Sequence, residues 1–410
     1  MSAPVSGQRP ERTRYDVIIV GGAMLGSSVA WFLATDPDFD GRVLVVERDP
    51  SYRHSSTAHT NSCMRQQFSS EINVRISQFA ADFVKNLRRY HGDDERVPEI
   101  TFDSYGYLYL ADSATFADAL RAACTVQNRC GAATRHLIRE EVARDYPFFR
   151  LDDIVAANHN RVDEGYFDGN TVFDWWRRGA REHGVEYLAD EVVGVHRNAA
   201  EDRIEGVTLA SGERIACGTL VNASGPRAAL TARLTGIDVP VEPRKRYTFV
   251  FEAERPLDRA LPLTIDPSGV HVRSDALIGR RTYLAGCPPD DDPAVDPDDF
   301  VQDHSLWEEK VWPALANRIP QFEAIRLING WVGHYAYNTL DQNAIVGPHP
   351  RLVNFLFVNG FSGHGFQQSP AMGRGISELI VHGAYRTLDL SPFGYERVVR
   401  GEPFVEQAVI

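Results

Sequence analysis

Hydrophobic positions near the start of the chain follow the order of a strand, a glycine-rich turn and a helix. Residues 15–20 (YDVIIV) form a short apolar, β-branched run that is typical of a buried parallel strand. Glycines follow directly, and apolar residues then continue through residues 30–33 (AWFL) with helical spacing. A second apolar run at 42–47 (RVLVVE) ends in an acid. Together these segments predict a βαβ unit with two parallel strands.

The rest of the chain alternates between helical and strand periodicity. Apolar spacing predicts helices over 72–89 and 172–184, and it predicts strands over 192–196, 219–223 and 354–358. Aromatic alternation over 105–110 and strand patterns over 247–252 and 270–273 indicate an antiparallel sheet. The predicted fold class is therefore α/β, with a Rossmann-type domain and an α+β substrate domain that contains the antiparallel sheet. The Rossmann-type domain is predicted to be discontinuous over 14–80, 150–240 and 336–390, the substrate domain to cover 81–149 and 241–335, and a C-terminal tail to cover 391–410.

Length, charge and cysteine content narrow the class of protein. A chain of 410 residues exceeds what one hydrophobic core usually serves, which agrees with two domains. The net charge of -13 and the scattered arginines argue against a nucleic-acid partner. The five cysteines, like His334, His349 and His364, lack the spacing of metal ligands, so no metal site is predicted. Residues 1–14 are polar and no long apolar window follows, so we expect a cytoplasmic protein without a membrane span. The oligomeric state stays open.

The glycine-rich turn at residues 21–26 (GGAMLG) carries a dinucleotide-binding pattern. Gly21 fits the tight turn and Gly26 fits the close contact between helix and strand, whereas Ala23 stands where a second glycine is usual. Glu47 ends the second strand roughly 20 residues further on, where an acid binds the ribose. The alternative is a glycine-rich turn between strand and helix that serves packing alone, and such a turn would not need this acid. The pattern therefore favours a dinucleotide at the helix N-terminus.

Three segments resemble the D-amino-acid oxidase superfamily of FAD enzymes, which includes sarcosine oxidase, glycine oxidase and dimethylglycine dehydrogenase. They are YDVIIVGGAMLG at 15–26, VNASGP at 221–226 and VNGFSGHGFQQSPAMGRGISELI at 358–380. Four further segments, at 61–77, 241–247, 311–323 and 337–350, are most similar to FAD-dependent oxidoreductase domain proteins, a group that includes a mitochondrial complex I assembly factor, and to their bacterial relatives. The resemblance covers nearly the whole chain and implies FAD as the dinucleotide.

The resemblance also implies which residues bind FAD. In the family the glycine-rich turn holds the pyrophosphate, the acid after the second strand holds the ribose, and a loop late in the chain turns its backbone N–H groups toward the N1–C2=O end of the flavin. Such donors stabilise the negative charge of reduced flavin. We expect the helix after this loop to carry Pro370 in its first turn. The implied cofactor-binding residues are Gly21, Gly22, Ala23, Met24, Leu25, Gly26, Glu47, Arg48, Ser55, Ser56, Asn61, Ser62, Val192, Ser224, Gly225, Gly360, Phe361, Ser362, Gly363, His364, Gly365, Phe366 and Gln367.

Departures from the family pattern shape the expected chemistry. His334 corresponds to the cysteine that tethers flavin in sarcosine oxidase, so we expect FAD to be bound non-covalently. Gln367 corresponds to a lysine that helps to hold the substrate carboxylate, which leaves Arg65 as the expected carboxylate ligand. An ungapped count places Tyr283 where sarcosine oxidase has its oxygen-activating lysine. The acceptor of the electrons, oxygen or a carrier, therefore stays open.

The predicted catalytic residues are Arg65, His334, Tyr337 and Gln367. Three of them have a plainer alternative. Arg65 could form an ion pair, with Arg273, Arg280 or Arg281 as the carboxylate ligand instead, and His334 and Tyr337, with Tyr335, could be buried side chains that satisfy each other. We expect His364 to orient the flavin loop, Lys245 to form a positioning ion pair and Cys63 to pack.

The predicted activity is FAD-dependent oxidation of the C–N bond of an N-substituted amino acid or related amine. A hydride would pass to flavin N5, and the imine would hydrolyse. Two alternatives stay open: oxidation of a primary amine of the D-amino-acid or glycine type, and an FAD-binding assembly or scaffold protein without turnover. A pyridine-nucleotide or disulfide reductase is disfavoured, because the chain has one dinucleotide fingerprint and no C-x-x-C pair.

Overall fold

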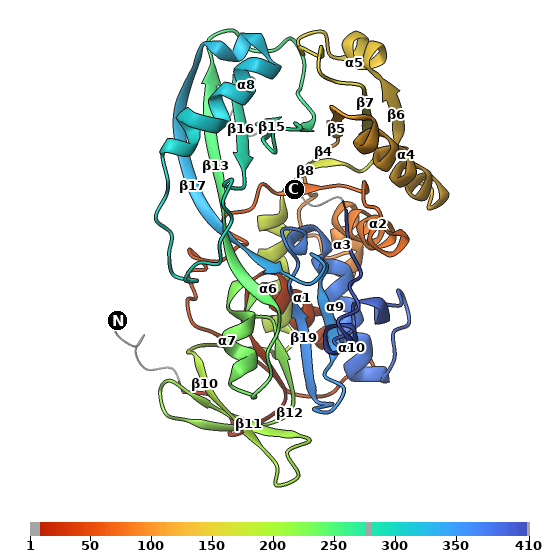
Figure 1. The fold of residues 1–410 in the computed structure, drawn as a ribbon. Helices are drawn as coiled ribbons and strands as arrows, with labels where there is room; N and C mark the ends of the chain where they lie inside the picture. Colours follow the sequence, from red (N-terminus) through yellow and green to blue (C-terminus); the bar gives the residue numbers. More distant parts are fainter. Residues whose placement is uncertain (1–8, 276–280, 408–410) are drawn as a thin grey trace.

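Two eight-stranded sheets organise the part of the chain that this computed structural model describes, residues 9–275 and 281–407. Figure 1 shows the first sheet in the lower half of the molecule and the second in the upper half, with the long strands β13 (Val241–Ala253) and β17 (Ile325–Asn338) reaching from one half toward the other. A small three-stranded sheet contains β3 (Cys63–Met64), β8 (Gly165–Phe167) and β4 (Phe102–Asp103).

The first sheet is the predicted Rossmann-type sheet. Strand β1 (Arg14–Val20) lies between β2 (Val43–Glu47) and β12 (Arg214–Asn222), and both neighbours run parallel to it. Parallel strands β9 (Glu186–Ala189) and β19 (Phe355–Asn359) extend the sheet on either side. The strands β10 (Val192–Arg197), β11 (Ile204–Leu209) and β18 (Ile345–Pro348) add antiparallel pairs.

Helices cover both faces of this sheet. The apolar residues of α1 (Met24–Thr35), α6 (Gly169–Glu182) and α9 (Gly365–His382) form one core with one face of the strands. Helix α7 (Ala228–Arg233) packs into the core on the other face. Helices α2 (Glu71–Lys85) and α3 (Leu87–Tyr90) extend the first core, and α10 (Glu396–Arg400) lies near the C-terminus.

The second sheet has the order β17-β13-β16-β15-β14-β5-β7-β6. Its pairs are antiparallel except β14 (Leu263–Ile265) with β5 (Tyr107–Ala111), which are parallel, so the predicted antiparallel sheet is in fact mixed. The remaining strands are β6 (Arg135–Ile138), β7 (Ala156–Asn160), β15 (His271–Ser274) and β16 (Thr282–Cys287). Helix α8 (Trp312–Arg318) contributes Leu315 to the aromatic core behind it, while α4 (Ala114–Arg129) and α5 (Arg139–Asp145) cover the outer strands.

The predicted domain boundaries at residues 81 and 150 differ from the structure. Residues 81–149 are predicted in the substrate domain, but the end of α2 and all of α3 pack into the first core. Residues 150–240 were assigned to the Rossmann-type domain, but β7 within them pairs with β5 and β6 in the second sheet. The sequence of β7, AANHN, has no apolar run that would mark it as a strand. It is buried because its polar side chains are satisfied inside, for example Asn158, whose Nδ2 donates to the Leu120 carbonyl oxygen over 2.7 Å.

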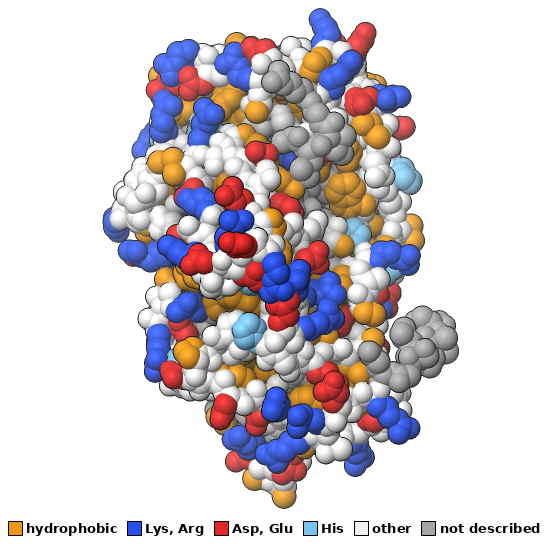
Figure 2. Space-filling model, turned by 180° about the vertical axis from the view of Figure 1, so that it is seen from behind, with side chains coloured by type: hydrophobic (Ala, Val, Ile, Leu, Met, Phe, Trp, Pro, Cys, Tyr) orange, Lys and Arg blue, Asp and Glu red, His pale blue; other side chains and the backbone are white. Residues whose placement is uncertain are grey.

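The surface charges and the lengths of the helices are the last features of the fold. On the face shown in Figure 2, Lys and Arg side chains are interspersed with Asp and Glu side chains. Among the described residues, the helices are too short or too polar for any of them to cross a membrane.

Candidate active site

A cavity of about 540 Å³ lies between the first sheet and the second sheet. The end of β1 and the end of β2 open into it through Val20 and Glu47, and β13 and β17 contribute Arg246, Thr248 and Tyr335 from the second sheet. Ligands of open parallel sheets bind outside the carboxyl ends of the strands, and small-molecule sites occupy about 300 to 1,000 Å³. The cavity therefore has the position and the size of a cofactor and substrate site.

The glycine-rich turn forms one end of this cavity and fits a pyrophosphate. Gly21 has φ +95°, and a Cβ on it would lie 2.6 Å from the carbonyl oxygen of Ala223. A Cβ on Gly26 would lie 1.9 Å from the carbonyl oxygen of Gly21. Helix α1 begins at Met24 after Ala23, which provides no side-chain cap. The turn thus brings a helix N-terminus to the cavity wall, where an anionic phosphate is stabilised.

Glu47 lies beside this turn in a position that suits a ribose. Its carboxylate accepts the backbone N–H of Gly22 over 2.8 Å and that of Asp49 over 2.9 Å. Burial raises the pKa of Glu47. The carboxylate lines the cavity and can accept hydroxyl groups of a ribose. Fitting residues therefore stand at both the pyrophosphate and the ribose positions of FAD.

Most of the predicted cofactor residues line the same cavity. They are Gly21, Ala23, Met24, Leu25, Glu47, Arg48, Ser55, Ser56, Asn61, Val192, Ser224, Gly225, Phe361, Ser362, Gly363, His364, Gly365, Phe366 and Gln367. Gly22, Gly26, Ser62 and Gly360 are not among its lining residues. Gly22 and Gly26 shape the turn from behind, through the contacts described above.

The loop before helix α9 forms the wall of the cavity that faces β17. Ser362 is fully buried with φ +48°, a conformation that costs energy for a residue with a Cβ. Gly363 has φ +96°, and a Cβ on it would lie 2.4 Å from the ring of Tyr335. Helix α9 begins at Gly365, so its first turn meets the cavity directly.

Pro370 lies in the second turn of α9 and not in the first turn, contrary to the prediction. The helix begins inside the glycine loop, earlier than the sequence suggested. Proline cannot donate to the carbonyl oxygen of Phe366, four residues before it. The hydroxyl of Ser369 donates to that oxygen over 2.7 Å instead. The local sequence therefore compensates for a proline inside the helix.

Arg65 is held at the cavity wall through both its side chain and its backbone. Its guanidinium donates to the carbonyl oxygen of Gln67 over 2.6 Å and to Nε2 of His364 over 2.9 Å, and it lies 4.1 Å from the ring centre of Phe68. Its backbone N–H donates to Oε1 of Gln367 over 2.8 Å. The side chain is 1% exposed. Two residues of the loop and of α9, His364 and Gln367, therefore fix the position of Arg65.

The charge state of this cluster follows from burial. Burial, and then the charge of Arg65, lower the pKa of His364 well below its ordinary value, so the imidazole is neutral and accepts from Arg65. Glu164 accepts from the side chain of Gln67 and from the backbone of Gln66, and burial raises its pKa to about 8. The cluster thus places a buried cation beside a neutral histidine in the cavity wall.

Not every predicted catalytic residue reaches the cavity. His334 lines it, but its Nε2 lies 2.9 Å from the carbonyl oxygen of Asp299 and its ring packs on Phe300. Tyr337 is not a lining residue, and the guanidinium of Arg244 lies over its ring at 4.1 Å. Tyr335, two residues earlier on the same strand, lines the cavity in its place.

The other residues singled out in the sequence lie mostly outside the cavity. Tyr283 is buried in the aromatic core of the second sheet, where its hydroxyl accepts from the backbone N–H of Leu257, and it does not line the cavity. Arg273 donates to the carbonyl oxygen of Asn61 and is not a lining residue, and Arg281 donates to backbone oxygens at an exposed position. Arg280 lies outside the described residues. Lys245 pairs with Asp299 over 2.8 Å, and Cys63 both lines the cavity and contacts the carbonyl oxygen of Asn61.

Sequence reasoning missed several polar residues of the cavity. Arg246 and Thr248 project from β13, and His271 projects from β15. The alternation of Arg244, Arg246 and Thr248 along β13 is the signal that could have identified a polar face toward the cavity. Arg246 stacks on Tyr335 at 4.7 Å and pairs with Asp292 over 2.8 Å.

Comparisons with known proteins agree with this geometry. A family model described as FAD dependent oxidoreductase matches residues 16–379. The FAD-dependent oxidoreductase domain-containing protein 1 of Xenopus laevis is 35% identical over 438 residues, covering 99% of this chain and 87% of that protein. Dimethylglycine dehydrogenase of Rattus norvegicus is 25% identical over 405 residues, covering 94% of this chain but 45% of that protein.

Solved structures show the same fold. The L-proline dehydrogenase of P. horikoshii matches with a TM-score of 0.81 at 25% identity, covering 95% of this chain and 99% of that one. The glycine oxidase of Geobacillus kaustophilus matches with a TM-score of 0.77 at 20% identity, covering 93% and 98% of the two chains.

Proposed function

Because this chain belongs to the FAD dependent oxidoreductase family, we propose that it oxidises the C–N bond of an N-substituted amino acid to an imine, which water then hydrolyses. FAD is its cofactor, and the chain is an FAD-dependent oxidoreductase related to amino-acid oxidases and dehydrogenases. The relatives named for a substrate act on proline, glycine or dimethylglycine, according to their names. These substrates share a carboxylate close to an amine.

The observation that carries the proposal is the buried guanidinium of Arg65 in the cavity wall. A guanidinium offers the planar pair of donors that a carboxylate prefers. His364 and Gln367 hold Arg65 in place, so little ordering remains to be done when a substrate binds. Because His364 is neutral, its imidazole adds no second positive charge beside the guanidinium of Arg65.

The other residues of the cavity orient the substrate and keep water out. When bound, FAD supplies the acceptor for the hydride from the carbon next to the amine nitrogen. Tyr107 and Tyr335 line the cavity with aromatic surface, and the glycine loop closes it on the side of α9. Such a site works by proximity and by exclusion of solvent. We propose no protein base, since a neutral amine can lose the hydride without one.

The test is an anaerobic titration of the purified holoprotein with a panel of amines. The panel contains N-methylglycine, N,N-dimethylglycine, L-proline, glycine and D-alanine, and the readout is loss of the visible flavin band. We expect N-substituted amino acids to bleach the flavin faster than glycine and D-alanine. Faster bleaching by the primary amines would favour the D-amino-acid or glycine type of reaction. If dithionite bleaches the flavin and none of the amines does, the chain binds FAD as an assembly or scaffold protein.

The electron acceptor is tested in the same sample. None of the described residues that line the cavity is a lysine. We therefore propose a carrier rather than oxygen as the fast acceptor. After bleaching, the flavin should return slowly on admission of air and rapidly on addition of an artificial carrier; rapid return in air would identify an oxidase.

A further inference from the structure

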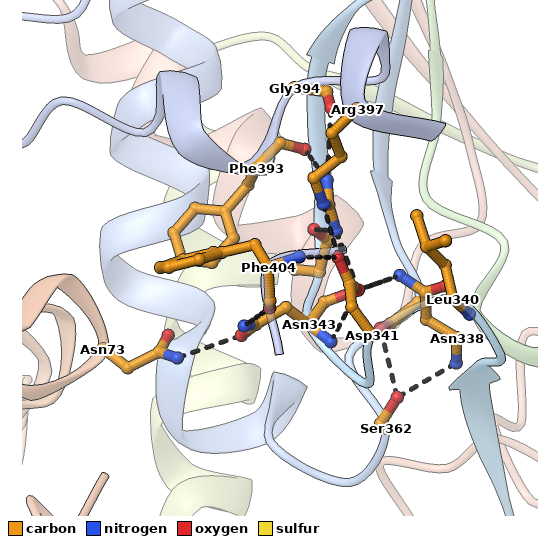
Figure 3. A network of polar contacts seen from close by, with 12 residues as sticks. Asn73, Asn338, Leu340, Asp341, Asn343, Ser362, Phe393, Gly394, Arg397 and Phe404 are labelled. Atoms are coloured by element: carbon orange, nitrogen blue, oxygen red, sulfur yellow. Dashed lines mark hydrogen bonds and ion pairs between the residues drawn. The ribbon is translucent and has the colours of Figure 1, made fainter. Parts of the chain in front are cut away.

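The C-terminal residues do not form a free tail. Arg397 on α10 and Glu406 after it are buried, at 8% and 1% exposure. Figure 3 shows that the guanidinium of Arg397 points into a polar network next to the loop that precedes α9. Residues 396–407, called here the C-terminal clamp, are therefore connected through this network to Ser362 in the wall of the cofactor cavity.

The first branch of the network runs from Arg397 to the strained residue of the loop. Arg397 donates from Nε to Oδ2 of Asp341 over 2.6 Å and from Nη2 to Oδ1 over 3.1 Å. Oδ1 of Asp341 also accepts Nδ2 of Asn338 over 2.8 Å. The backbone N–H of Asn338 donates to the hydroxyl of Ser362 over 3.0 Å. This chain of bonds ends on the residue with φ +48° in the cavity wall.

The second branch reaches the first turns of α9. Glu406 accepts from Nδ2 of Asn73 over 2.9 Å, and Oδ1 of Asn73 accepts from Gln368 over 3.1 Å. Gln368 follows Gln367, the residue that holds the backbone of Arg65. Glu406 also accepts from the backbone and hydroxyl of Ser69. The loop before α9 and the first turns of α9 are thus both connected by hydrogen bonds to the C-terminal clamp.

We propose that the two buried residues of the C-terminal clamp, Arg397 and Glu406, are part of the FAD site, and that Arg397 and Asp341 are positioning residues that hold the Ser362 turn against the cofactor. A residue with a Cβ persists in the left-handed region only where its surroundings over-determine it. The ion pair is buried, with side-chain exposures of 8% for Arg397 and 0% for Asp341, and its two hydrogen bonds fix the direction of the Asp341 carboxylate and through it Asn338. The inference rests on the cofactor and not on which amine is oxidised.

The consequence for the cofactor is electrostatic. Backbone N–H groups of this loop that would face the flavin would stabilise the negative charge of its reduced form only while their direction is fixed. The N–H groups of Ser362 and His364 donate to the carbonyl oxygens of Ala336 and Phe361 and so help to hold the turn itself. When the clamp is weakened, the turn can leave its strained conformation and the N–H groups that would face the flavin lose their alignment. The oxidised form is then favoured, and the reduction potential of bound FAD falls.

The test compares Arg397→Met with Arg400→Met in the FAD-loaded protein. Arg400 lies on the same helix, but its side chain is 60% exposed and pairs with Glu396 at the surface. For Arg397→Met we expect the equilibrium constant for two-electron reduction to fall about tenfold, which is about 30 mV, and amide hydrogen exchange of residues 360–364 to become faster. Arg400→Met should change neither. Both readouts are independent of the substrate, so they fail or succeed separately from the proposed amine oxidation.

Two further variants keep the test decisive if Arg397→Met does not fold. Arg397→Lys keeps the charge but loses the planar fork, so it should show a smaller shift of the same sign. The double variant Asp341→Asn with Arg397→Met removes both charges and should recover thermal stability without recovering the potential. If the folded variants show the parent's potential and loop exchange while their melting temperatures fall, the clamp stabilises the fold only and the proposal is overturned.

Discussion

At the residue scale, Arg65 depends on neighbours that are far away in the sequence. His364 and Gln367 come from the loop and helix at the other end of the chain, and they bind its side chain and its backbone respectively. Since burial and Arg65 lower the pKa of His364, the imidazole adds no second charge to the cluster. The cluster is therefore arranged to keep one positive charge fixed in a dry wall, which is the condition for recognising a carboxylate.

Arg65→Ala should lower kcat/KM for the best carboxylated amine by roughly two to three orders of magnitude. A charge-assisted pair in a buried site is worth about 2 to 4 kcal/mol, and about 1.4 kcal/mol is a factor of ten. Arg65→Lys should recover part of the loss. Steady-state kinetics measures the effect, and an unchanged flavin spectrum checks the site.

The matched control for Arg65 is Arg326→Ala, whose side chain is 77% exposed and pairs with Glu252. It should behave like the parent protein. A parent-like rate in Arg65→Ala would show that the carboxylate binds elsewhere, and Arg246 in the same cavity would be the next candidate.

His334 leads to a second prediction at this scale, that FAD is bound non-covalently. The position that carries the tether in sarcosine oxidase holds an imidazole whose Nε2 contacts the carbonyl oxygen of Asp299. Acid precipitation should release all of the yellow colour into the supernatant. Colour that stays in the protein pellet would contradict this, and Cys63, which lines the cavity, would then be tested by Cys63→Ser.

At the scale of elements, the contact between α1 and the turn before it decides whether the cofactor can bind. Gly26 leaves no room for a side chain against the carbonyl oxygen of Gly21, so the helix approaches the strand at the distance that the pyrophosphate site requires. The sequence predicted this unit well. Its strands are continuous apolar runs, and Gly21 and Gly26 stand at positions where backbone contacts leave no room for a side chain.

Gly26→Val should abolish FAD binding, and Gly26→Ala should weaken it strongly. The added Cβ would lie 1.9 Å from backbone, which has no flexible end that could move aside. Gly194→Ala is the matched control, because a Cβ there meets Thr208 at an ordinary 3.5 Å. Flavin content of the purified proteins measures the effect. Full occupancy in Gly26→Val would mean that the turn does not hold the pyrophosphate.

Other elements could not be predicted, because their stabilising contacts are polar and distant. Strand β7 is buried through side-chain hydrogen bonds of Asn158 and Asn160, which give no apolar pattern. The sequence predicts a C-terminal tail over residues 391–410, but Arg397 and Glu406 are buried, and they form hydrogen bonds with residues more than 50 positions away. Tyr337 and Tyr335 share one face of β17, so strand periodicity does not distinguish them, and only the structure shows that Tyr335 lines the cavity.

At the scale of the whole molecule, histidines buried in both halves couple the fold to pH. Burial lowers the pKa of His91, His159, His271 and His349 to about 4, and it lowers the pKa of His334 and His364 as well. These residues are neutral in the folded protein. An unfolded chain binds protons at such positions below about pH 6.5. The folded state is therefore disfavoured as the pH falls through the range between these two pKa values.

The free energy of unfolding should decrease as the pH falls from about 7 to about 5. The unfolded chain binds more protons there, and for a histidine such as His159, with 5% exposure and a pKa of about 4, the slope approaches about 1.4 kcal/mol per pH unit. Glu164, whose pKa is raised to about 8, and Glu47, whose pKa is also raised, act in the opposite direction, but they are two groups against six histidines. Chemical denaturation at both pH values measures the effect.

The variant His159→Asn should reduce the number of protons taken up on unfolding by about one, and so make the free energy of unfolding depend less steeply on pH. The variant His304→Asn, at an exposed position, serves as the control. A free energy of unfolding that stays constant or rises toward pH 5 would show that these histidines already carry protons in the folded protein.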